Sequence, residues 1–180
     1  MEGISTLRHT IREGDWLAKL DLKDAYLAVP IFSHHRKFLR FKWGCDIFEF
    51  VSLPFGLSSA PWAFTKLLRV VIAHLRKLGL RLVIYLDDIL VVASSQLAAR
   101  LAVNQVRSLL ESLGFVISVE KSVEDPVQAL KYIGLFIDTL SMKLLLPERK
   151  RLDIYRLCKA ALKASSLSRK ELEKIIDNLY

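Results

Sequence analysis

Two adjacent carboxylates, Asp87 and Asp88, lie in the middle of the apolar segment 83–92, which is rich in β-branched residues. Burying an unpaired carboxylate is costly, and two neighbouring carboxylates also repel each other. A sequence that keeps both there indicates a compensating cation, for which a divalent metal ion is the common choice. The segment therefore predicts a strand–turn–strand hairpin that offers both aspartates to metal ions at its tip. An ordinary Asp-Asp turn is the alternative.

A third carboxylate, Asp21, lies in the segment 16–22, whose apolar residues alternate as in a strand. Lys19 and Asp21 lie on one face of this strand, opposite Ala18 and Leu20. A solvent-facing strand residue is the alternative interpretation of Asp21.

Central pairing of this strand with the hairpin would bring Asp21, Asp87 and Asp88 to one edge of a sheet. Three carboxylates so close together cannot all stay ionised without cations. Two Mg²⁺ ions about 3.5–4 Å apart, with Mn²⁺ as a substitute, would neutralise them and clamp the attacking and leaving oxygens of a phosphoryl transfer. The formal net charge of +8 fits a nucleic-acid substrate for such a reaction.

The segments around these residues alternate between strand and helix patterns. The expected elements, in chain order, are a short helix over 1–14, an aromatic hairpin of 38–43 with 47–51, a helix from Pro61 to Gly79, a helix over 96–113, a strand over 115–119, a charged loop over 120–125, a hairpin of 130–138 with 142–146, and a basic helix after Pro147. Hairpin connections of this kind predict an α+β fold with an antiparallel sheet.

The apolar residues of each helix predict the face that it buries. In the helix that starts at Pro61, with Ser58 or Ser59 as its cap, these are Phe64, Leu67, Leu68, Val71, Ile72, Leu75 and Leu78. In the next helix they are Leu97, Leu101, Val106, Leu109, Leu110 and Leu113. Near the end of the chain, a capping box over 168–171 precedes a stripe formed by Leu172, Ile175, Ile176 and Leu179, which needs a partner to pack on.

The composition indicates an ordinary folded domain. The chain has 180 residues, 52% of them hydrophobic, which is enough for one domain with a core and excludes a disordered chain. Cys45 and Cys158 have no metal-ligand spacing and are expected to be free thiols in a reducing compartment. No leader peptide and no apolar run of membrane-spanning length is found, so an intracellular protein without membrane contact is expected rather than a secreted one.

Five segments, taken in order, resemble the sequence motifs of reverse transcriptases. They are Leu20–Tyr26, Leu53–Pro61, Tyr85–Asp88, Gly114–Lys121 and Leu130–Gly134. Each motif alone is weak, but five in the right order cover nearly the whole chain. The resemblance implies a polymerase palm, with a central antiparallel sheet flanked by helices, an incomplete fingers region and the start of a thumb.

The expected domain boundaries follow from the same resemblance. Residues 1–147 would form the palm, with partial fingers at about 27–57, and residues 148–180 would begin the thumb helices. The implied activity is that of an RNA-directed DNA polymerase core from a retroelement, which adds dNTPs to a primer 3′-hydroxyl on an RNA or DNA template. It would act in the cytoplasm, the nucleus or a virus-like particle.

The resemblance also implies site residues. Asp21, Asp87 and Asp88 would be catalytic and would bind the two Mg²⁺ ions, with the backbone carbonyl of Leu22 as a further ligand. The residues implied to contact the dNTP are Asp24, Ala25, Tyr26, Phe55, Gly56 and Lys121.

Two of these dNTP contacts have competing interpretations. The Tyr26 ring would exclude a 2′-hydroxyl, or it is a core aromatic residue instead. Lys121 would protonate or neutralise leaving pyrophosphate, or it is a solvated surface lysine. Among residues implied to contact template or primer, Arg36, Lys37 and Arg40 resemble the basic strand of the fingers. Tyr132, Ile133 and Gly134 resemble the primer-grip hairpin.

The chain also departs from the family pattern. Retroviral enzymes have glutamine at the position of Phe55, and the form found here is similar to retrotransposon enzymes, DIRS-like elements first and gypsy-like ones next. Few residues precede Asp21, so most of the fingers is expected to be missing, as in a palm core cut from a polyprotein or its shortened descendant. The alternatives are a catalytically inactive fragment that binds nucleic acid or a partner and, more remotely, a palm-type nucleotide cyclase or two-metal nuclease.

Overall fold

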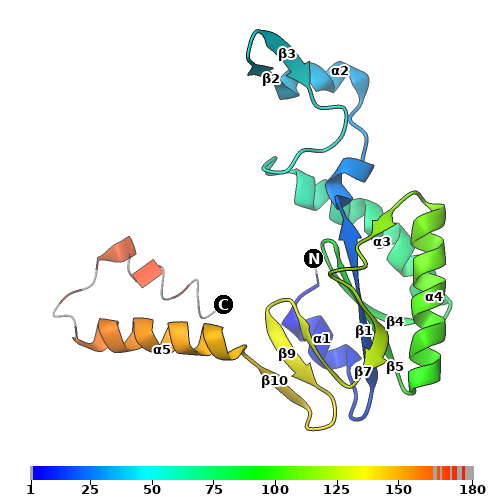
Figure 1. Ribbon diagram of the computed structural model, residues 1–180, viewed down its shortest axis with the longest axis vertical. Helices are drawn as coiled ribbons and strands as arrows, with labels where there is room; N and C mark the ends of the chain where they lie inside the picture. Colours follow the sequence, from blue (N-terminus) through cyan, green and yellow to red (C-terminus); the bar gives the residue numbers. More distant parts are fainter. Residues whose placement is uncertain (1, 164–165, 167, 171, 174–175, 177–180) are drawn as a thin grey trace.

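The computed structural model describes residues 2–163, 166, 168–170, 172–173 and 176. Its centre is a five-stranded sheet in the order β4-β5-β1-β6, with β7 also paired to β1 (Figure 1). The strands are β1 (Trp16–Lys23), β4 (Arg81–Tyr85), β5 (Asp88–Ala93), β6 (Val116–Ile117) and β7 (Val123–Val127). β1 runs antiparallel to β5, β6 and β7, and β4 runs antiparallel to β5. The expected α+β fold with a central antiparallel sheet is confirmed.

The sheet separates two hydrophobic clusters, because successive residues of a strand point to opposite faces. On one face, Ala18 and Leu20 pack with α3 (Ala60–Lys77) and α4 (Gln96–Ser112).

On the other face, Leu17 packs with α1 (Ile4–Thr10) and a three-stranded sheet of order β10-β9-β8. The strands of this second sheet are β8 (Ala129–Tyr132), β9 (Leu135–Asp138) and β10 (Lys143–Leu145). Figure 1 shows α3 and α4 on one side of β1 and α1, β9 and β10 on the other.

A buried ion pair fixes the start of β1 against the start of β4. The carboxylate of Asp15, 2% exposed, receives both terminal nitrogens of Arg81 at 2.7 Å and the backbone N–H of Arg12 at 2.7 Å. A two-pronged arginine–carboxylate pair is strong and directional, and either partner left alone would be a buried charge. This pair therefore links the start of β4 to the residue before β1, across the intervening β5 and at the end of the sheet away from the aspartates.

Two parts of the chain extend away from the central sheet (Figure 1). The first contains η1 (Ala25–Ala28), α2 (Ser33–Arg36), η2 (Lys37–Leu39) and the antiparallel hairpin of β2 (Arg40–Trp43) and β3 (Asp46–Glu49), whose eight strand residues are all exposed. The second is α5 (Glu148–Lys163), which has no buried residue. Among the helices described, none has the length and apolar content needed to cross a membrane.

Several expected strand and loop boundaries were wrong. The expected strand over 115–119 is only Val116–Ile117, and the expected loop over 120–125 contributes to β7. Of the charged residues of this strand, Glu124 is partly buried and is balanced by Arg107 of α4, whose Nη2 lies 2.8 Å from Glu124 Oε1, whereas the Asp125 side chain is 91% exposed to solvent.

Two further expected elements have other limits. The segment 130–138 is a hairpin in itself, because the chain turns at Ile133 and Gly134 with positive φ angles of 41° and 77°. The helix expected over 1–14 spans only Ile4–Thr10.

The buried face of α4 also differs from the expectation. Leu97, Leu101 and Leu113 are 70%, 58% and 52% exposed. The buried residues are Ala99, Ala102, Val103, Val106 and Leu110. Ser95 caps this helix through its hydroxyl, which accepts a hydrogen bond from the N–H of Ala98. Val106 and Leu110 were expected to be buried and are, and Leu109 is partly buried against the core. Ala99, Ala102 and Val103, whose small side chains allow close packing on the sheet, are buried where Leu97 and Leu101 were expected.

The helix α3 follows its expected stripe more closely. Phe64, Leu68, Ile72 and Leu75 are buried, whereas Leu67 and Leu78 are 44% and 60% exposed. Ser59 occupies the cap position without a side-chain hydrogen bond.

Near the C-terminus, the N–H of Leu172 donates to the Ser168 carbonyl at 3.1 Å, and both Leu172 and Ile176 are exposed. The other residues of the expected capping box and stripe, Glu171, Ile175 and Leu179, lie outside the described residues.

Candidate active site

The two adjacent aspartates lie at a tight hairpin turn, as the sequence predicted. Tyr85 pairs with Asp88, so Leu86 and Asp87 form a two-residue turn and Asp88 is the first residue of β5. Leu86 has a φ of 54°, in the left-handed region that a branched residue rarely adopts. Such a conformation costs roughly 1–2 kcal/mol per residue, and strain of this kind clusters at functional sites.

The third aspartate lies directly across the sheet from this turn. Asp21 of β1 pairs with Asp88 of β5, and the N–H of Leu22 donates to the carbonyl of Asp87 at 2.9 Å. Asp21 is only 7% exposed, so the interpretation of it as a solvent-facing residue was wrong. The central strand pairing therefore brings all three carboxylates to one end of the sheet.

The backbone of Asp21 is anchored by two serines that the sequence patterns did not reveal. The N–H of Asp21 donates to Ser122 Oγ at 3.0 Å, and its carbonyl accepts from the N–H of Ser118 at 2.8 Å. The Ser122 hydroxyl in turn donates to the Ser118 carbonyl at 2.6 Å. Because Ser122 precedes β7, no local pattern indicates its contact with β1. The network fixes the position of Asp21 at the sheet edge.

The electrostatics of the site centre on Asp21. Burial raises its pKa above the ordinary value, the ammonium of Lys121 opposes this, and the carboxylates of Asp88 and Asp87 raise the pKa further. Lys121 is exposed, as a solvated surface lysine would be, and its charge also acts on this carboxylate, as a lysine of the site would. The structure is thus compatible with both interpretations of Lys121. The fold therefore disfavours the charge of Asp21 unless a cation is nearby.

Among the described side chains, Asp21 Oδ1 and Asp88 Oδ1 are buried without a hydrogen bond. Asp88 Oδ1 nevertheless has an ionic partner, Lys19 Nζ at 3.1 Å. Asp21 Oδ1 is thus the unsatisfied atom of the pair. Lys19 is a further residue of the site that the sequence motifs did not single out.

The donor chemistry fits a hard cation. Carboxylate oxygens are the ligands that Mg²⁺ prefers. Within the part of the chain that the structure describes, no three His, Cys, Asp or Glu side chains converge as a ready metal site. A cation bound by Asp21 would therefore complete its shell with backbone, water or substrate oxygens, as Mg²⁺ commonly does.

Tyr26 lies beside this cluster and joins it to the loop before α3. Its ring centroid is 5.2 Å from that of Phe55 and 5.4 Å from that of Phe64. Burial raises the pKa of the Tyr26 hydroxyl, and the charges of Asp87 and Tyr85 raise it further. Phe64 belongs to the core whereas Phe55 is 65% exposed, so Tyr26 is at once a core contact and a wall of the site.

The other residues expected to face a nucleotide lie around the same end of β1. Asp24 is exposed and adopts a left-handed φ of 50°, and Ala25, which follows it, is buried. Gly56 is exposed next to Phe55, with a φ of 88° that favours glycine.

The three basic residues expected on one strand do not share one. Arg36 ends α2, Lys37 begins η2, and Arg40 alone of the three is in β2. The chain makes two short helical turns here before it extends, which the aromatic and basic pattern did not indicate. Arg40 Nε lies 3.0 Å from Glu49 Oε2 across the hairpin, and Arg36 Nε donates to the carbonyl of Ile31 at 3.1 Å.

Tyr132 is buried beneath the β4–β5 hairpin. It is 1% exposed, and its hydroxyl lies 2.9 Å from the Val83 carbonyl and 3.2 Å from the Asp88 carbonyl. Its ring therefore lies inside the fold, and the primer-grip role of residues 132–134 stays a prediction. Ile133 is half-buried, and Gly134 is exposed at the turn from β8 to β9.

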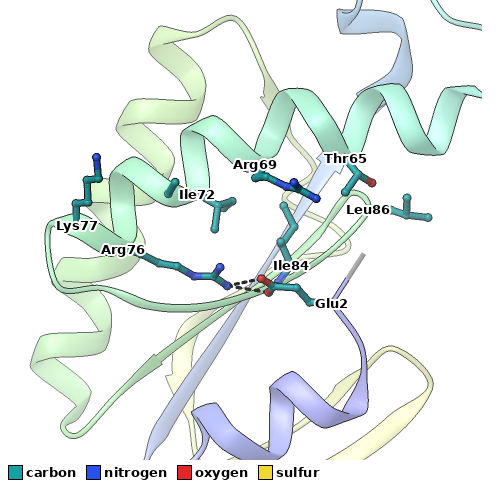
Figure 2. Close-up of a pocket in the computed structure, with 9 residues that line it drawn as sticks. Glu2, Thr65, Arg69, Ile72, Arg76, Lys77, Ile84 and Leu86 are labelled. Atoms are coloured by element: carbon teal, nitrogen blue, oxygen red, sulfur yellow. Dashed lines mark hydrogen bonds and ion pairs between the residues drawn. The ribbon is translucent and has the colours of Figure 1, made fainter.

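A pocket of about 500 Å³ opens beside the other edge of the hairpin (Figure 2). Figure 2 shows the Glu2 carboxylate turned toward Arg76, with Leu86 at the far end of the pocket. The Glu2 carboxylate lies 2.7 Å from Arg76 Nη2 and accepts the N–H of Ile84 at 3.0 Å. The three aspartates do not line this pocket, so it lies behind the candidate active site.

Comparison with known proteins decides the family. The family described as "Reverse transcriptase (RNA-dependent DNA polymerase)" matches residues 1–137. The chain belongs to this family. Reverse transcriptases are RNA-directed DNA polymerases and therefore nucleotidyltransferases.

Curated relatives of this reverse transcriptase domain are large polyproteins. The Gag-Pol polyprotein of avian leukosis virus subgroup A is 31% identical over 127 residues, which is 66% of this chain and 8% of the relative. The transposon Tf2-3 polyprotein of Schizosaccharomyces pombe is 28% identical over 134 residues, 74% of this chain and 10% of the relative. The chain thus spans about a tenth or less of these relatives, which are retroviral and retrotransposon proteins.

Solved structures share the fold of the domain. A foamy viral protease–reverse transcriptase in complex with RNA/DNA hybrid has a TM-score of 0.74 and 20% identity, with 99% of this chain and 23% of that chain covered. The same protein type in complex with double-stranded DNA has a TM-score of 0.76 and 20% identity, with 93% of this chain and 27% of that chain covered. The fold is that of an α+β polymerase palm.

Proposed function

We propose that the domain catalyses template-guided addition of dNTPs to a primer 3′-hydroxyl, as the core of a retroelement RNA-directed DNA polymerase. The observation that carries this proposal is the pairing of Asp21 with Asp88, next to the turn that holds Asp87. A buried, unsatisfied carboxylate oxygen on Asp21 gives the cluster a physical need for a cation.

Asp21, Asp87 and Asp88 would hold two Mg²⁺ ions, for which Mn²⁺ can substitute, with the Leu22 carbonyl as a further ligand. When bound, these ions supply charge stabilisation to a phosphoryl transfer. The chain itself would position the carboxylates that hold these ions, because the serine network fixes the backbone of Asp21 and Asp87 lies in the tight β4–β5 turn. Lys121, near Asp21, would neutralise or protonate the leaving pyrophosphate.

The nucleotide would lie between the end of β1 and the loop before α3. Asp24 and the amide of Ala25 would face the triphosphate, and Phe55 and Gly56 the templating base pair. The Tyr26 ring, held by Phe64, would lie under the sugar and exclude a 2′-hydroxyl.

Template and primer would follow the exposed basic and hairpin surfaces. Arg36, Lys37 and Arg40 would contact the template strand or the triphosphate through their charges. The exposed turn at Ile133 and Gly134 would support the primer, while Tyr132 would support the turn from beneath.

These roles divide the chain into the regions of a polymerase. Residues 1–147 would be the palm, with partial fingers at about 27–57, and residues 148–180 would start the thumb. The Pro54–Pro61 sequence favours a retrotransposon origin, DIRS-like before gypsy-like. A domain of this origin would work in the cytoplasm, the nucleus or a virus-like particle.

Primer extension with Mg²⁺ tests the catalytic proposal. Asp87→Asn should lower dNTP incorporation by at least about a hundredfold, because it removes a carboxylate that would hold the charge-stabilising Mg²⁺ ions. Asp153→Asn, an exposed aspartate on α5, is the matched control and should keep wild-type activity. Equal incorporation by wild type and Asp87→Asn would contradict the metal assignment.

One observation favours a second candidate, a catalytically inactive module that binds nucleic acid or a partner. The Lys19 ammonium already occupies Asp88, and the net charge of +8 suits a polyanion without any chemistry. This candidate predicts salt-sensitive binding of a template–primer without incorporation. Any Mg²⁺-dependent extension that Asp87→Asn abolishes would exclude it.

A further inference from the structure

An ion pair links Lys19 to the carboxylate cluster. The distance from Lys19 Nζ to Asp88 Oδ1 is 3.1 Å, and the two side chains are only 16% and 25% exposed. In the strand register Asp88 lies opposite Asp21, and Lys19 lies opposite Leu90. The pair therefore joins diagonal neighbours on β1 and β5, a separation that a long side chain can bridge. Limited exposure means that water and salt screen this pair less than an ion pair on the surface.

The pair neutralises one carboxylate of the site and leaves another unsatisfied. Among the described residues, Asp88 Oδ1 accepts no hydrogen bond, so the Lys19 ammonium is its balancing group. Asp21 Oδ1, also buried without a hydrogen bond, has no such ion pair. A divalent cation that approaches Asp88 therefore meets a positive charge already in place, and like charges at this range repel.

We propose that Lys19 is an internal counter-cation of Asp88, which competes with a divalent ion for this carboxylate and weakens metal binding to the free protein. The inference rests on the proposed function, because it takes Asp88 as a metal ligand. Tight metal binding then requires the additional negative charge and ligands that a nucleoside triphosphate brings. Lys19 acts through Asp88 and is a positioning residue.

Titration of the full 180-residue chain with Mn²⁺ alone, followed by electron paramagnetic resonance, tests the inference. Lys19→Met keeps most of the apolar length without the charge and should bind Mn²⁺ about three- to tenfold more tightly than wild type. Lys19→Arg keeps the charge and should bind as weakly as wild type. Lys143→Met, which removes an exposed lysine of β10, should also match wild type and controls for net charge.

Thermal unfolding in chelator first establishes that each variant folds. Added Mn²⁺ should then raise the Tm of Lys19→Met more than that of wild type, because a ligand stabilises the state that binds it more tightly. Unchanged or weaker Mn²⁺ binding by folded Lys19→Met overturns this inference and leaves the proposed function intact. Wild-type Mn²⁺ affinity in Asp87→Asn would show that the carboxylates are not the metal site, and both proposals would then fail.

Discussion

Asp21 is the residue at which stability and the proposed function oppose each other. Its side chain is more deeply buried than those of Asp87 and Asp88, and one of its oxygens has no hydrogen bond among the described residues. Burial and the two neighbouring carboxylates raise its pKa, with Lys121 opposing them. Without a cation, the folded chain is therefore destabilised by the charge that the proposed catalysis would need, a trade-off common at active sites.

Replacement of this charge should stabilise the metal-free protein. Because the pKa of Asp21 is raised in the fold, ionisation costs the folded state more than the unfolded state. The cost is absent below the ordinary pKa of 3.8 and develops as the pH rises above it. Asp21→Asn should thus raise the Tm by roughly 2–4 °C at neutral pH, with a gain that shrinks toward zero in acid. Thermal unfolding in chelator across this pH range measures the gain.

The control for this prediction is Asp153→Asn, since Asp153 is exposed on α5 and lies 3.7 Å from Arg156. It should give no gain that grows with pH. A Tm loss in Asp21→Asn would show that the folded chain stabilises Asp21 as an anion, and a gain that does not depend on pH would show that the gain does not come from its ionisation. Either result would contradict the prediction.

At the scale of elements, the β8–β9 hairpin supports the β4–β5 hairpin through the buried side chain of Tyr132. The Tyr132 hydroxyl lies within hydrogen-bond distance of two carbonyls, those of Val83 on β4 and Asp88 on β5. A hydroxyl has one proton to donate, so the two carbonyls share it. Tyr132 thus connects β4 and β5 to the turn at Ile133 and Gly134, which follows it in the chain.

Removal of this hydroxyl should destabilise the β4–β5 hairpin without creating a cavity in the core. Tyr132→Phe keeps the ring and should lower stability by about 1 kcal/mol, the usual net worth of a buried hydrogen bond. The Tm should fall by roughly 2–4 °C, and the amide protons of β5 should exchange faster. Tyr155→Phe, at an exposed position of α5, is the control and should leave both measurements unchanged. Identical Tm values for the two variants would exclude a supporting role for the Tyr132 hydroxyl.

Sequence patterns predicted elements well where one face of a regular segment is buried. The stripe of α3 shows this on one face, whereas β1, β4 and β5 are apolar runs buried on both faces, and all of these element types were confirmed. The patterns failed where long-range contacts decide the outcome. Leu97 and Leu101 of α4 are exposed because smaller residues face the sheet, and the charged segment before Val127 joins the sheet with Glu124 balanced by Arg107 of α4.

In the candidate site, too, local patterns predicted some residues, and long-range contacts decide the others. The three aspartates were found because carboxylates in apolar strands are unusual, whereas the central strand pairing that unites them was only assumed and is given by the register. Lys19 and Ser122 were missed because only the register between β1 and its neighbours places them at the site. The burial of Tyr132 was not foreseen, because its motif gives no information about which side of the hairpin its ring occupies.

For the whole molecule, positive charge and exposed shape favour a nucleic-acid partner. The net charge is +8, and the part formed by α2, η2, β2 and β3 projects from the sheet with its strand residues exposed (Figure 1). Lys37 lies exposed on this projection, with its ammonium 5.2 Å from the Phe38 ring centroid. A cation beside an exposed aromatic ring suits contact with a phosphate backbone and its bases.

Binding of a short RNA/DNA hybrid should therefore weaken steeply as salt increases, because each neutralised phosphate releases counterions. Lys37→Ala should reduce the slope of log K against log salt by about one, the effect of one lost phosphate contact. Fluorescence anisotropy over a range of salt concentrations measures this slope. Lys143→Ala removes the same charge from β10 and should keep the wild-type slope, since β10 lies away from the projection (Figure 1). Equal slopes for wild type, Lys37→Ala and Lys143→Ala would place the nucleic acid elsewhere on the molecule.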